Sequence, residues 1–513
     1  MIRLAFLLVV AMLATPLACA ETFVVTRNDD PAPNGCLPGD CSLREALIDA
    51  SADPGTLHTI LLDGATYGLP RGGLTYAGQI RISGNSNTTT TIEGDGVEPV
   101  LTASGAASIQ LLQLAIKAHG QHALDASVDG DTFLYRLRIP EADSQVWVQG
   151  SSDGLGNVQV IQSEIRAYFD CGRSQLCQVR DSQMLRLQAG KGGATRVSIS
   201  GSTFDGDFVQ NQSSGVVVHS TEPVTISHTT IQNGDIGLVF SGTPQPIAVD
   251  HLHFIGNERP LRLAAATGLT IDASEFRDNE NPHGLGNGSG ALWISNSGAT
   301  ATVTASTFSG NAGNDYAGGA VLVENGASLT VRNSTFSNNT FLGTGVGNPR
   351  GAAIGYQDDA ATTKLVLDHV TIVAPAYVPD IGIVGTTIGG YGGESGLVLT
   401  VRNSIVRGSC GLEANAMDTN IGNVESGGDT CQFSAPGSQV GISSGALALG
   451  TLGDHGGPTP TYKPAANSVA INAAAAAFCT EFDQRGYPRP FGGECDVGAV
   501  EADDDVLFKD GFE

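Results

Sequence analysis

An eight-residue pattern returns ten times between residues 158 and 406, and it restricts the folds open to this chain more than any other feature. Two copies are ATVTASTF at 301–308 and LTVRNSTF at 329–336. The first, third and eighth positions are apolar in every copy, and the alternation at the start has the period of two typical of a half-buried strand. The copies begin at Val158, Cys177, Val197, Val224, Ile247, Leu269, Ala301, Leu329, Leu365 and Leu399. Each copy is therefore predicted to be a β-strand.

The copies begin 19 to 36 residues apart, and repeats of this length are typical of solenoids, propellers and arrays. A four-stranded propeller blade needs about 40 residues and its own hairpins, whereas most of these intervals are shorter and lack paired Asn-Gly turns. Helical and leucine-rich repeats are excluded because a period of 3.6 residues is missing. The pattern therefore predicts an all-β chain with a parallel β-helix over residues 58–445. A β-sandwich with strands that are similar by coincidence is the alternative.

In a parallel β-helix, equivalent positions of successive coils stack into columns, so positions one, three and eight are expected to form the buried core. Position six is Ser or Thr in eight of the ten copies, and its hydroxyl is expected to bond to backbone where the strand turns. Four copies carry Asn three residues after position eight, a residue that tolerates a left-handed turn and can stack its amide on the next coil. These are Asn257, Asn279, Asn311 and Asn339. Further strands are expected at 215–220, 235–240, 290–294, 318–323 and 351–356.

Residues 1–20 are predicted to be a signal peptide that directs export. Arg3 supplies the charged start, residues 4–14 the apolar run, and Ala18, Cys19 and Ala20 the small-residue cleavage site. The apolar run is too short to span a bilayer, and no later stretch reaches the roughly 18 apolar residues that a transmembrane helix needs. Cys19 is assigned to the signal peptide, with a lipid-anchored protein as the minor alternative. We therefore expect a protein that is secreted or held at the outer cell surface.

The chain is strongly acidic, which excludes one class of partner. Its formal net charge is −26, and it becomes −27 after export because Arg3 is the only charged residue in the signal peptide. Phosphate backbones and anionic membranes are bound through clustered Lys and Arg, so nucleic acid is not expected as a partner.

Export leaves eight cysteines that fall into local couples. They are Cys36 with Cys41, Cys171 with Cys177, Cys410 with Cys431, and Cys479 with Cys495. In an oxidising compartment such couples favour short-loop disulfides over metal sites, which usually combine CxxC-like pairs with His. Eight cysteines allow 105 connectivities, so proximity favours this pairing without fixing it.

Both ends of the solenoid need closing, because an open end exposes core and unpaired strand edges. Residues 21–57 are predicted to form an N-terminal cap of a strand and a short helix, in which Ser42 and Glu45 have capping-box spacing. Residues 446–502 lose the repeat and are rich in Gly and Pro, so a C-terminal domain of irregular extended segments is expected. Residues 503–513 form an acidic tail.

Several motifs resemble those of exported bacterial proteins. The segment CLPGDCSLREALIDA at 36–50 resembles their N-terminal CSLREA segment, and FIGN, FRDN, FSGN and FSNN together with GGAV resemble the repeats of polymorphic outer-membrane proteins. The stretch from Leu452 to Glu501 resembles the C-terminal choice-of-anchor domain of such proteins, and LFKDGFE resembles their tail. The resemblance covers most of the mature chain. It implies a right-handed parallel β-helix of the pectin-lyase-like superfamily at the cell surface, within a group of which many members have no assigned activity.

Catalytic candidates are few. His228, His251 and His369 share position five of the pattern, and Asp250 and Asp368 precede two of them. The same position is Gln162, Asp181, Asn333 and Asn403 in other copies, which favours a polar corner over an active site. The acid pairs Asp205 with Asp207 and Asp358 with Asp359 are interpreted as solvated turns. The Asn-Thr-Asp, Gly-His-Gly and Arg-Ile-Lys signatures of polygalacturonases are missing, so no catalytic residue is assigned.

The sequence thus favours a non-catalytic surface protein, an adhesin or envelope component that binds an extracellular polysaccharide or a cell-surface ligand. A polysaccharide lyase or glycoside hydrolase is the alternative, since β-helices also carry such enzymes. Either function is expected on the face with the longest loops, at 277–300, 309–328, 337–364 and 373–398. No cofactor is expected. An acidic rod can bind structural Ca²⁺, but the GGxGxDxUx repeat is missing and no ligands are assigned.

Overall fold

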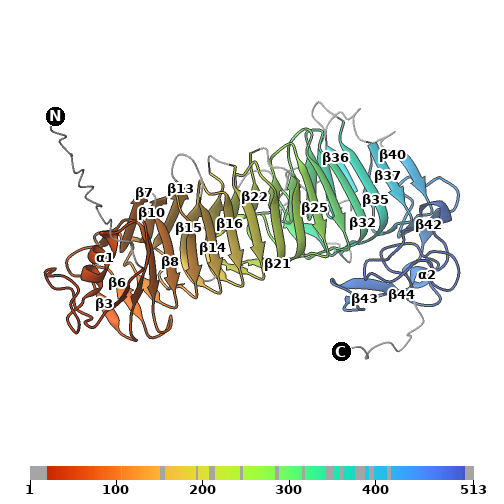
Figure 1. The fold of residues 1–513 in the computed structure, drawn as a ribbon. Coiled ribbons are helices and arrows are strands. Elements are labelled where there is room, and N and C mark those ends of the chain that lie inside the picture. Colours follow the sequence, from red (N-terminus) through yellow and green to blue (C-terminus); the bar gives the residue numbers. More distant parts are fainter. Residues whose placement is uncertain are drawn as a thin grey trace, which may run out of the picture.

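The computed structural model shows an elongated parallel β-helix whose coils stack along one axis, with the earliest residues at one end and the latest at the other (Figure 1). Among the described residues, 40 strands belong to one continuous sheet. The predicted fold class is confirmed, and the β-sandwich alternative is excluded. The structure describes residues 20–105, 107–150, 156–191, 194–206, 214–242, 246–282, 288–314, 318–342, 351–357, 362–375, 388–391, 398–412 and 417–502.

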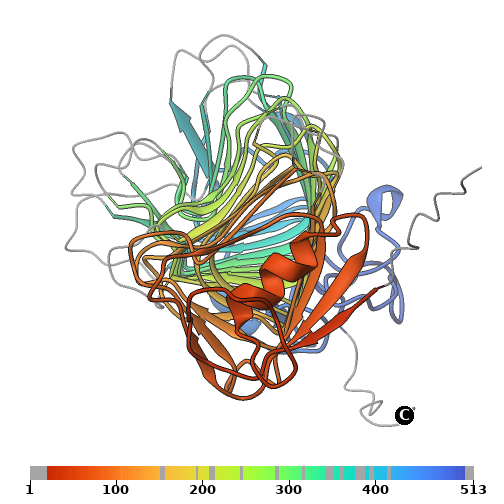
Figure 2. The ribbon, with the colours of Figure 1, turned by 60° about the vertical axis from the view of Figure 1, so that its left-hand side comes forward.

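The strands pair from coil to coil along three faces, which Figure 2 shows around the axis of the rod. The first face contains β4 (Leu74–Tyr76), β7 (Leu101–Gly105), β10 (His122–Val128), β13 (Gln145–Gly150), β15 (Glu164–Cys171), β17 (Gln183–Ala189), β20 (Gly215–Val218), β22 (Gly237–Phe240), β24 (Leu261–Leu263), β27 (Leu292–Ile294), β31 (Val321–Glu324), β34 (Ile354–Gln357), β36 (Ile388–Tyr391) and β39 (Cys410–Gly411).

The second face contains β1 (Thr22–Val24), β2 (Leu57–Leu61), β5 (Gln79–Ser83), β8 (Ser108–Leu112), β11 (Thr132–Tyr135), β14 (Asn157–Ile161), β16 (Leu176–Arg180), β18 (Arg196–Ser200), β21 (Val224–Gln232), β23 (Ile247–Ile255), β25 (Gly268–Asp272), β28 (Thr300–Thr304), β32 (Ser328–Ser337), β35 (Lys364–Val373), β37 (Val398–Arg402) and β40 (Met417–Ile421). The third face contains β3 (Thr66–Gly68), β6 (Thr91–Glu93), β9 (Ala115–Lys117), β12 (Arg138–Ile139), β19 (Thr203–Asp205), β26 (Glu275–Arg277), β29 (Thr307–Ser309), β38 (Ile405–Arg407), β41 (Val424–Ser426) and β42 (Gln439–Ile442). Longer strands bend at a corner and serve two faces: β15 and β17 run from the third face into the first, and β21, β23, β32 and β35 from the second into the third.

The register of these strands matches the eight-residue pattern. Each first position pairs with the first position of the next copy, as in Leu269 with Ala301 and Ala301 with Leu329. Each eighth position pairs likewise, so that Phe276, Phe308 and Phe336 form one column with ring centroids 4.6 and 4.8 Å apart. All three side chains are fully buried. The predicted interior columns are therefore confirmed, and they hold the continuous apolar core that no single coil could bury.

The hydroxyls at position six line the corner between the second and third faces. Ser306 donates to the carbonyl of Thr304 in its own coil, at 2.7 Å, and accepts the backbone N–H of Ser274 in the preceding coil, at 3.1 Å. Ser274 and Ser334 repeat both contacts with their own neighbours. The predicted hydrogen bonds between hydroxyl and backbone are confirmed, and they satisfy backbone groups that the turn takes out of the strand ladder.

Position five, just before this hydroxyl, has a left-handed backbone in all ten copies. The residues are Gln162, Asp181, Gly201, His228, His251, Ala273, Ala305, Asn333, His369 and Asn403, with φ between +43° and +57°. This conformation turns the chain from the second face into the third and costs any residue with a Cβ some strain. The interpretation of position five as a corner is thus confirmed.

The four asparagines after position eight form a buried ladder at the next corner. The side-chain amide of Asn279 donates to Asn311 Oδ1 at 2.8 Å, and Asn311 donates to Asn339 Oδ1 at 3.0 Å. The predicted amide stacking is confirmed. The expected left-handed backbone is wrong for these residues, because the residue before each asparagine makes that turn, as Asp278 (φ +54°) does before Asn279. The asparagine side chain can then point inward and bond to the coils on either side.

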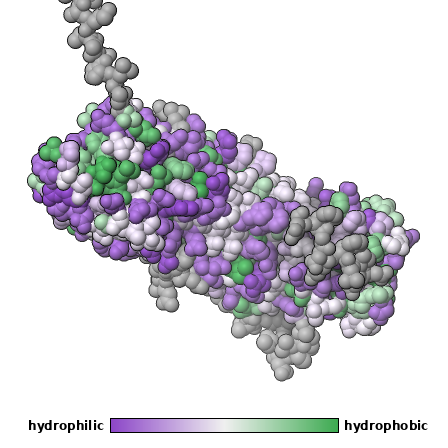
Figure 3. All heavy atoms as spheres, turned by 60° about the horizontal axis from the view of Figure 1, so that its bottom comes forward, coloured by the Kyte–Doolittle hydropathy of each residue, from purple (hydrophilic) through white to green (hydrophobic). Residues whose placement is uncertain are grey.

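Helix α1 (Leu43–Ser51) covers the N-terminal end of the rod, in front of the coils in Figure 2. Ser42 and Glu45 form the predicted capping box. Leu43, Ala46, Leu47 and Ala50 are buried in the same core as the first coils. Several large hydrophobic side chains stay exposed in this part of the chain, namely Val24, Leu37, Ile48, Leu61 and Val97. Figure 3 shows a hydrophobic area at this end and a mostly hydrophilic surface elsewhere on the side it displays.

The C-terminal segment, residues 446–502, is largely irregular, as expected. Helix α2 (Ser444–Leu447) leads into it, and it contains β43 (Leu449–Gly453) paired antiparallel with β44 (Thr461–Pro464) and one 3₁₀ turn, η2 (Ala476–Phe478). The sequence predicted a domain that closes the C-terminal end, but it did not indicate which face of the rod the segment contacts. It packs against the outside of the third face, where it covers the column Thr307, Thr335 and Thr371. Gln484 accepts from Thr335 Oγ1 at 2.6 Å, and Thr371 Oγ1 accepts from the backbone N–H of Ala499 at 2.9 Å.

In the part of the chain that the structure describes, no helix combines the length and apolar character needed to cross a lipid bilayer.

Candidate functional site

Outward positions on the first face carry a series of aromatic and polar side chains. The strands alternate, so Val146 and Val148 are buried in the core while Trp147 between them faces outward and stays partly exposed. The register places Trp147 beside Asp170 and Arg262 beside Trp293 on neighbouring coils. We call this surface the aromatic face and define it as Trp147, Tyr168, Asp170, Arg186, Gln188, Arg262 and Trp293.

Guanidinium groups stack on the aromatic rings of this face. Arg186 lies over the Tyr168 ring at 4.8 Å from its centroid, and Arg262 lies over the Trp293 ring at 4.2 Å. The indole N–H of Trp293 donates to Glu324 Oε1 at 3.0 Å. Such stacking and hydrogen bonding hold the rings in fixed positions and leave an edge of each accessible. The aromatic face is therefore a rigid, partly apolar surface with fixed polar groups.

A polar cluster lies at the N-terminal half of the aromatic face. The phenol of Tyr168 donates to Gln188 Oε1 at 2.6 Å and lies 3.4 Å from Asp170 Oδ2. Asp170 is buried, and the disulfide of the adjacent Cys171 with Cys177 fixes the end of its strand. His219 follows β20, and its Nδ1 is hydrogen-bonded to the hydroxyl of Ser241 on the next coil.

Burial shifts the proton affinities of this cluster in opposite directions. It raises the pKa of the Asp170 carboxyl, an effect that the positive charge of Lys191 partly offsets. It lowers the pKa of His219, and Lys191 adds to that decrease. Burial, with the nearby Asp170 charge, also raises the pKa of Tyr168 to about 12. A raised carboxyl pKa and a lowered imidazole pKa bring two groups closer to each other in proton affinity, and such pairs occur in general acid–base catalysis.

Sequence reasoning missed the members of this cluster. Asp170, Lys191 and His219 come from three successive coils and lie on or beside first-face strands, outside the eight-residue pattern. Their spacing in the chain depends on connections of different lengths, so no fixed motif relates them. The signal available was weak: a single polar residue flanked by buried ones, such as Asp170 between Phe169 and Cys171.

The histidines selected from the sequence separate into two places. His228 and His251 lie on successive coils, and their rings stack at a centroid distance of 4.5 Å with an angle of 5° between planes. His251 Nδ1 lies 2.7 Å from Asp250 Oδ1. His369 is several coils away and fully buried. The structure therefore brings together His228, Asp250 and His251, and excludes His369 from them.

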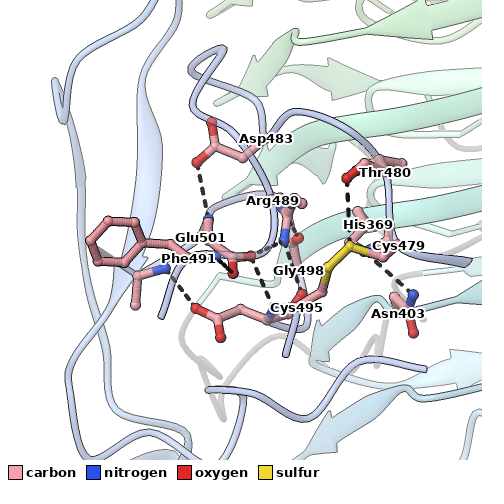
Figure 4. A network of polar contacts seen from close by, with 12 residues as sticks. His369, Asn403, Cys479, Thr480, Asp483, Arg489, Phe491, Cys495, Gly498 and Glu501 are labelled. Carbon is pink, nitrogen blue, oxygen red and sulfur yellow. Dashed lines mark hydrogen bonds and ion pairs between the residues drawn. A yellow bond between two sulfur atoms is a disulfide. The ribbon is translucent and has the colours of Figure 1, made fainter. Parts of the chain in front are cut away.

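His369 lies beneath the C-terminal segment (Figure 4). Its Nδ1 is 2.9 Å from Asp368 Oδ1, and its Nε2 is 3.3 Å from the side-chain amide of Asn403. Burial lowers its pKa, while the hydrogen bond to Asp368 acts in the opposite direction. A histidine closed off in this way cannot reach a ligand from solvent, so its contacts support the docking of the C-terminal segment.

A cleft of about 770 Å³ lies between the corner of the rod and the C-terminal segment. The rod contributes His251, Asp272 and Asn333, and the segment contributes residues 480–486. The cleft is thus next to the paired histidines and on a different side of the rod from the aromatic face.

Of the two acid pairs selected from the sequence, only Asp205 lies within the described residues. Asp205 accepts a hydrogen bond from Gln232 at 2.6 Å and one from Asn233 at 3.0 Å, so it links two coils at the surface. Asp207, Asp358 and Asp359 lie outside the described residues. So do large parts of the four long loops, including 283–287, 315–317, 343–350 and 376–387.

All four expected cysteine couples are disulfide-bonded. The pairs are Cys36 with Cys41, Cys171 with Cys177, Cys410 with Cys431, and Cys479 with Cys495. Disulfides of this density are typical of chains that fold in an oxidising compartment, and they are consistent with an extracellular protein.

One family model agrees with the fold: residues 175–341 match the model described as right handed beta helix region. No curated protein sequence matches the chain. One similar solved structure is described as the crystal structure of pectate lyase Pel9A; it is 14% identical, covers 95% of this chain and 98% of its own, and has a TM-score of 0.23. The strand pairing and the family model together identify the fold as a right-handed parallel β-helix.

Proposed function

We propose that this chain is an exported β-helical binding protein, adhesin-like or part of the cell envelope, that holds an extracellular polysaccharide along its aromatic face. The observation that carries the proposal is the series of stacked rings and guanidinium groups on one face of the rod. The accessible parts of the aromatic rings offer sugar rings apolar contacts, while polar groups beside them bind hydroxyls and fix orientation.

The dimensions of the aromatic face support a long ligand. From β13 to β27 the chain makes six strand-to-strand steps along the first face, and at about 4.8 Å per step this amounts to roughly 29 Å. A surface of this length exceeds what a small metabolite can contact and is suited to several consecutive sugar units. Ring stacking at both ends, by Trp147 and Tyr168 and by Trp293, favours an extended polymer over a compact ligand.

Export is supported by two features that point the same way. The first 20 residues have the composition of a signal peptide, and the four disulfides are typical of oxidising compartments. Surface display is suggested by the resemblance of the end segments to those of exported β-helical proteins. The strongly negative charge disfavours binding to polyanions in general, so neutral polysaccharides are the first ligands to test.

Affinity electrophoresis of the purified mature chain in gels containing neutral or acidic polysaccharides tests the proposal. We expect retardation by at least one polysaccharide, and about fivefold weaker retention for Trp293→Ala, since an aromatic ring in contact with a sugar contributes about 1 kcal/mol. Phe491→Ala is the matched control, because Phe491 is a partly exposed aromatic residue on the C-terminal segment. Absence of retardation across the panel, or equal losses for both variants, would reject polysaccharide binding on this face.

The second candidate function is a polysaccharide lyase or glycoside hydrolase. Only the Asp170 and His219 pair favours it, because burial raises the pKa of the carboxyl and lowers the pKa of the imidazole. An assay for reducing ends and for unsaturated sugars, with Ca²⁺ added and removed, distinguishes the two functions. Release of product that Asp170→Asn abolishes, while polysaccharide binding remains, would establish the enzyme; a bound but unaltered polysaccharide supports the binding protein.

A further inference from the structure

Two histidines occupy the same corner on successive coils of the second face. The register pairs Ser227 with Asp250, which places His228 next to the Asp250–His251 dipeptide. Both histidines have a left-handed backbone with φ +47°. This corner directs both side chains outward and in parallel, and their rings stack 4.5 Å apart. The arrangement is therefore set by the backbone of the coil and not by the flexible ends of two surface side chains.

One carboxylate lies against both rings. Asp250 Oδ1 is 2.7 Å from His251 Nδ1, and Asp250 Oδ2 is 3.9 Å from His228 Nδ1. One ligand atom from each of the three residues can be chosen so that all lie within 4.8 Å of one another. His228 and His251 keep 67% and 42% of their side-chain surface exposed, so small ring rotations can bring the nitrogen atoms to about 2 Å from a shared ion.

A second carboxylate adjoins this group on the next coil. The register pairs Asp250 with Asp272, so their side chains leave the sheet on the same side. Asp272 is exposed, so its carboxylate is free to turn towards the carboxylate of Asp250 or towards solvent. Two neighbouring carboxylates repel each other, and a cation between them removes that repulsion.

The corner itself does not require histidine. Asn333 and Asn403 occupy it on other coils with φ +43° and +47°, and asparagine adopts the left-handed conformation readily. Two successive histidines occur at this corner only here in the ten copies, and they coincide with Asp250 and Asp272. The fold therefore requires a left-handed backbone at this corner, but it does not require two histidines with two neighbouring aspartates.

We propose that His228, Asp250 and His251 bind a divalent transition-metal ion, with Zn²⁺ as the best fit, and that Asp272 lies beside the ion as a fourth ligand or an anionic neighbour. Two imidazoles and a carboxylate suit Zn²⁺, Cu²⁺ or Ni²⁺, whereas Ca²⁺ and Mg²⁺ prefer oxygen ligands alone. His251 and Asp272 both line the cleft beside residues 480–486. An open coordination position on the ion would therefore be next to that cleft. The proposal is independent of the aromatic face, which lies elsewhere on the rod.

Titration calorimetry of the purified mature chain, treated with EDTA and dialysed, tests the site with ZnCl₂. We expect one equivalent of Zn²⁺ to bind with a Kd below about 10 µM, and His228→Asn and His251→Asn each to weaken binding at least tenfold. Asparagine is the substitution of choice because the same corner already accepts it at Asn333 and Asn403. Thermal unfolding of each variant without metal verifies that the fold is unchanged.

His253→Gln is the matched control. His253 lies two residues after His251, is 49% exposed at its side chain, and pairs with Glu275 at 3.2 Å outside the proposed ligand set. Zn²⁺ binding that the control retains and the two corner variants lose supports the site, as does a tetrahedral Co²⁺ visible spectrum that disappears in His251→Asn. Absence of stoichiometric Zn²⁺ binding to the wild-type chain, or equal losses in the control and the corner variants, would overturn it.

Discussion

The two ends of the rod are covered in different ways. At the N-terminal end, α1 packs an apolar surface of Leu43, Ala46, Leu47 and Ala50 on the core of the first coils. Near the C-terminal end, residues 446–502 fold back along the third face, where a small apolar cluster joins them to Ile405 and Val424 of the rod and buried polar contacts add to it. The same physical need, to keep water from core and unpaired backbone, is met by an amphipathic helix in one case and by a small apolar cluster combined with a buried polar network in the other.

The polar network of the C-terminal segment contains two buried ion pairs, and Figure 4 shows the one between Arg489 and Glu501. Arg489 Nη1 lies 2.8 Å from Glu501 Oε2, and Arg485 Nη2 lies 2.8 Å from Asp483 Oδ2, with all four side chains almost fully buried. Arg489 also donates to the carbonyls of Asp496 and Gly498. Such pairs fix a unique arrangement for a segment without regular strands, although burying the charges costs solvation energy.

The cover of the N-terminal end was predictable from the sequence, whereas the docking of the C-terminal segment was not. An amphipathic helix leaves a regular apolar spacing and a capping box, so α1 follows from the residues directly. Buried ion pairs leave no periodic pattern, so neither the pairs nor the docking position of the segment could be foreseen. The experiments below test whether the two ends depend on these different forces.

The largest effect is expected for Arg489→Ala in the C-terminal network. The substitution leaves the Glu501 carboxylate buried without its partner, which costs about 3–5 kcal/mol. Hydrogen exchange should show faster exchange across residues 446–502, while the central coils keep their protection. Glu494→Ala, an exposed carboxylate in the same segment, is the control. Unchanged exchange in Arg489→Ala would show that the ion pair does not hold the segment.

Leu47→Ala is the matching change at the N-terminal end. Leu47 is 1% exposed, and removing its side chain should lower the free energy of unfolding by about 3 kcal/mol through lost burial and a cavity. The adjacent Ile48 is 48% exposed on the same helix, so Ile48→Ala should change urea stability very little. Equal effects of the two substitutions would contradict closure by the apolar surface of α1.

A smaller effect is expected from Ser42→Ala. Ser42 caps α1 by accepting the backbone N–H of Glu45, and the Glu45 carboxylate accepts the N–H of Ser42 in return. Loss of the cap should cost about 1 kcal/mol in urea unfolding, and Ser42→Asp should recover most of it. A loss as large as that of Leu47→Ala would indicate that the N-terminal end depends on this polar cap as much as on the apolar surface of α1.

The smallest effect concerns pH and His369. Its pKa is lowered from 6.5 by burial, with Arg489 adding to the decrease and Asp368 and Glu501 opposing it. As pH falls below 6.5, the unfolded chain binds a proton on this histidine before the folded chain does, so the folded state loses stability. Asp496, whose pKa burial raises to about 6, acts in the opposite sense, because the folded chain binds its proton first as pH falls towards 6.

The contribution of His369 is therefore measured as the difference between the wild-type chain and His369→Asn. Unfolding in urea between pH 7.5 and 5 should show a loss of stability for the wild type relative to this variant as pH falls. Asparagine is neutral throughout and suits the left-handed corner that His369 occupies. Parallel pH profiles for the two proteins would refute a titrating role for His369.

Much of the fold was predictable because every coil must place apolar side chains in the same core. The register from Val158 to Val406 follows from apolar positions that must all face one core, and the position-six hydroxyls from backbone groups that need partners. The aromatic face and the cluster around Asp170 were not predictable, because outward positions face no common constraint and differ from coil to coil. The pairing of His228 with His251 was foreseeable from position five, whereas the burial of His369 depends on the C-terminal segment, which begins 77 residues later in the chain.

The unbroken columns from Val158 to Val406 keep the same core register whatever the length of the connections between the strands. Copies of the pattern begin 19 to 36 residues apart, yet each advances the axis by one strand spacing, because extra residues are accommodated at the corners. A mutation that lengthens a connection can therefore alter what the surface recognises without disturbing the interior. Such a scaffold lets recognition evolve one winding at a time while the hydrophobic stack stays the same.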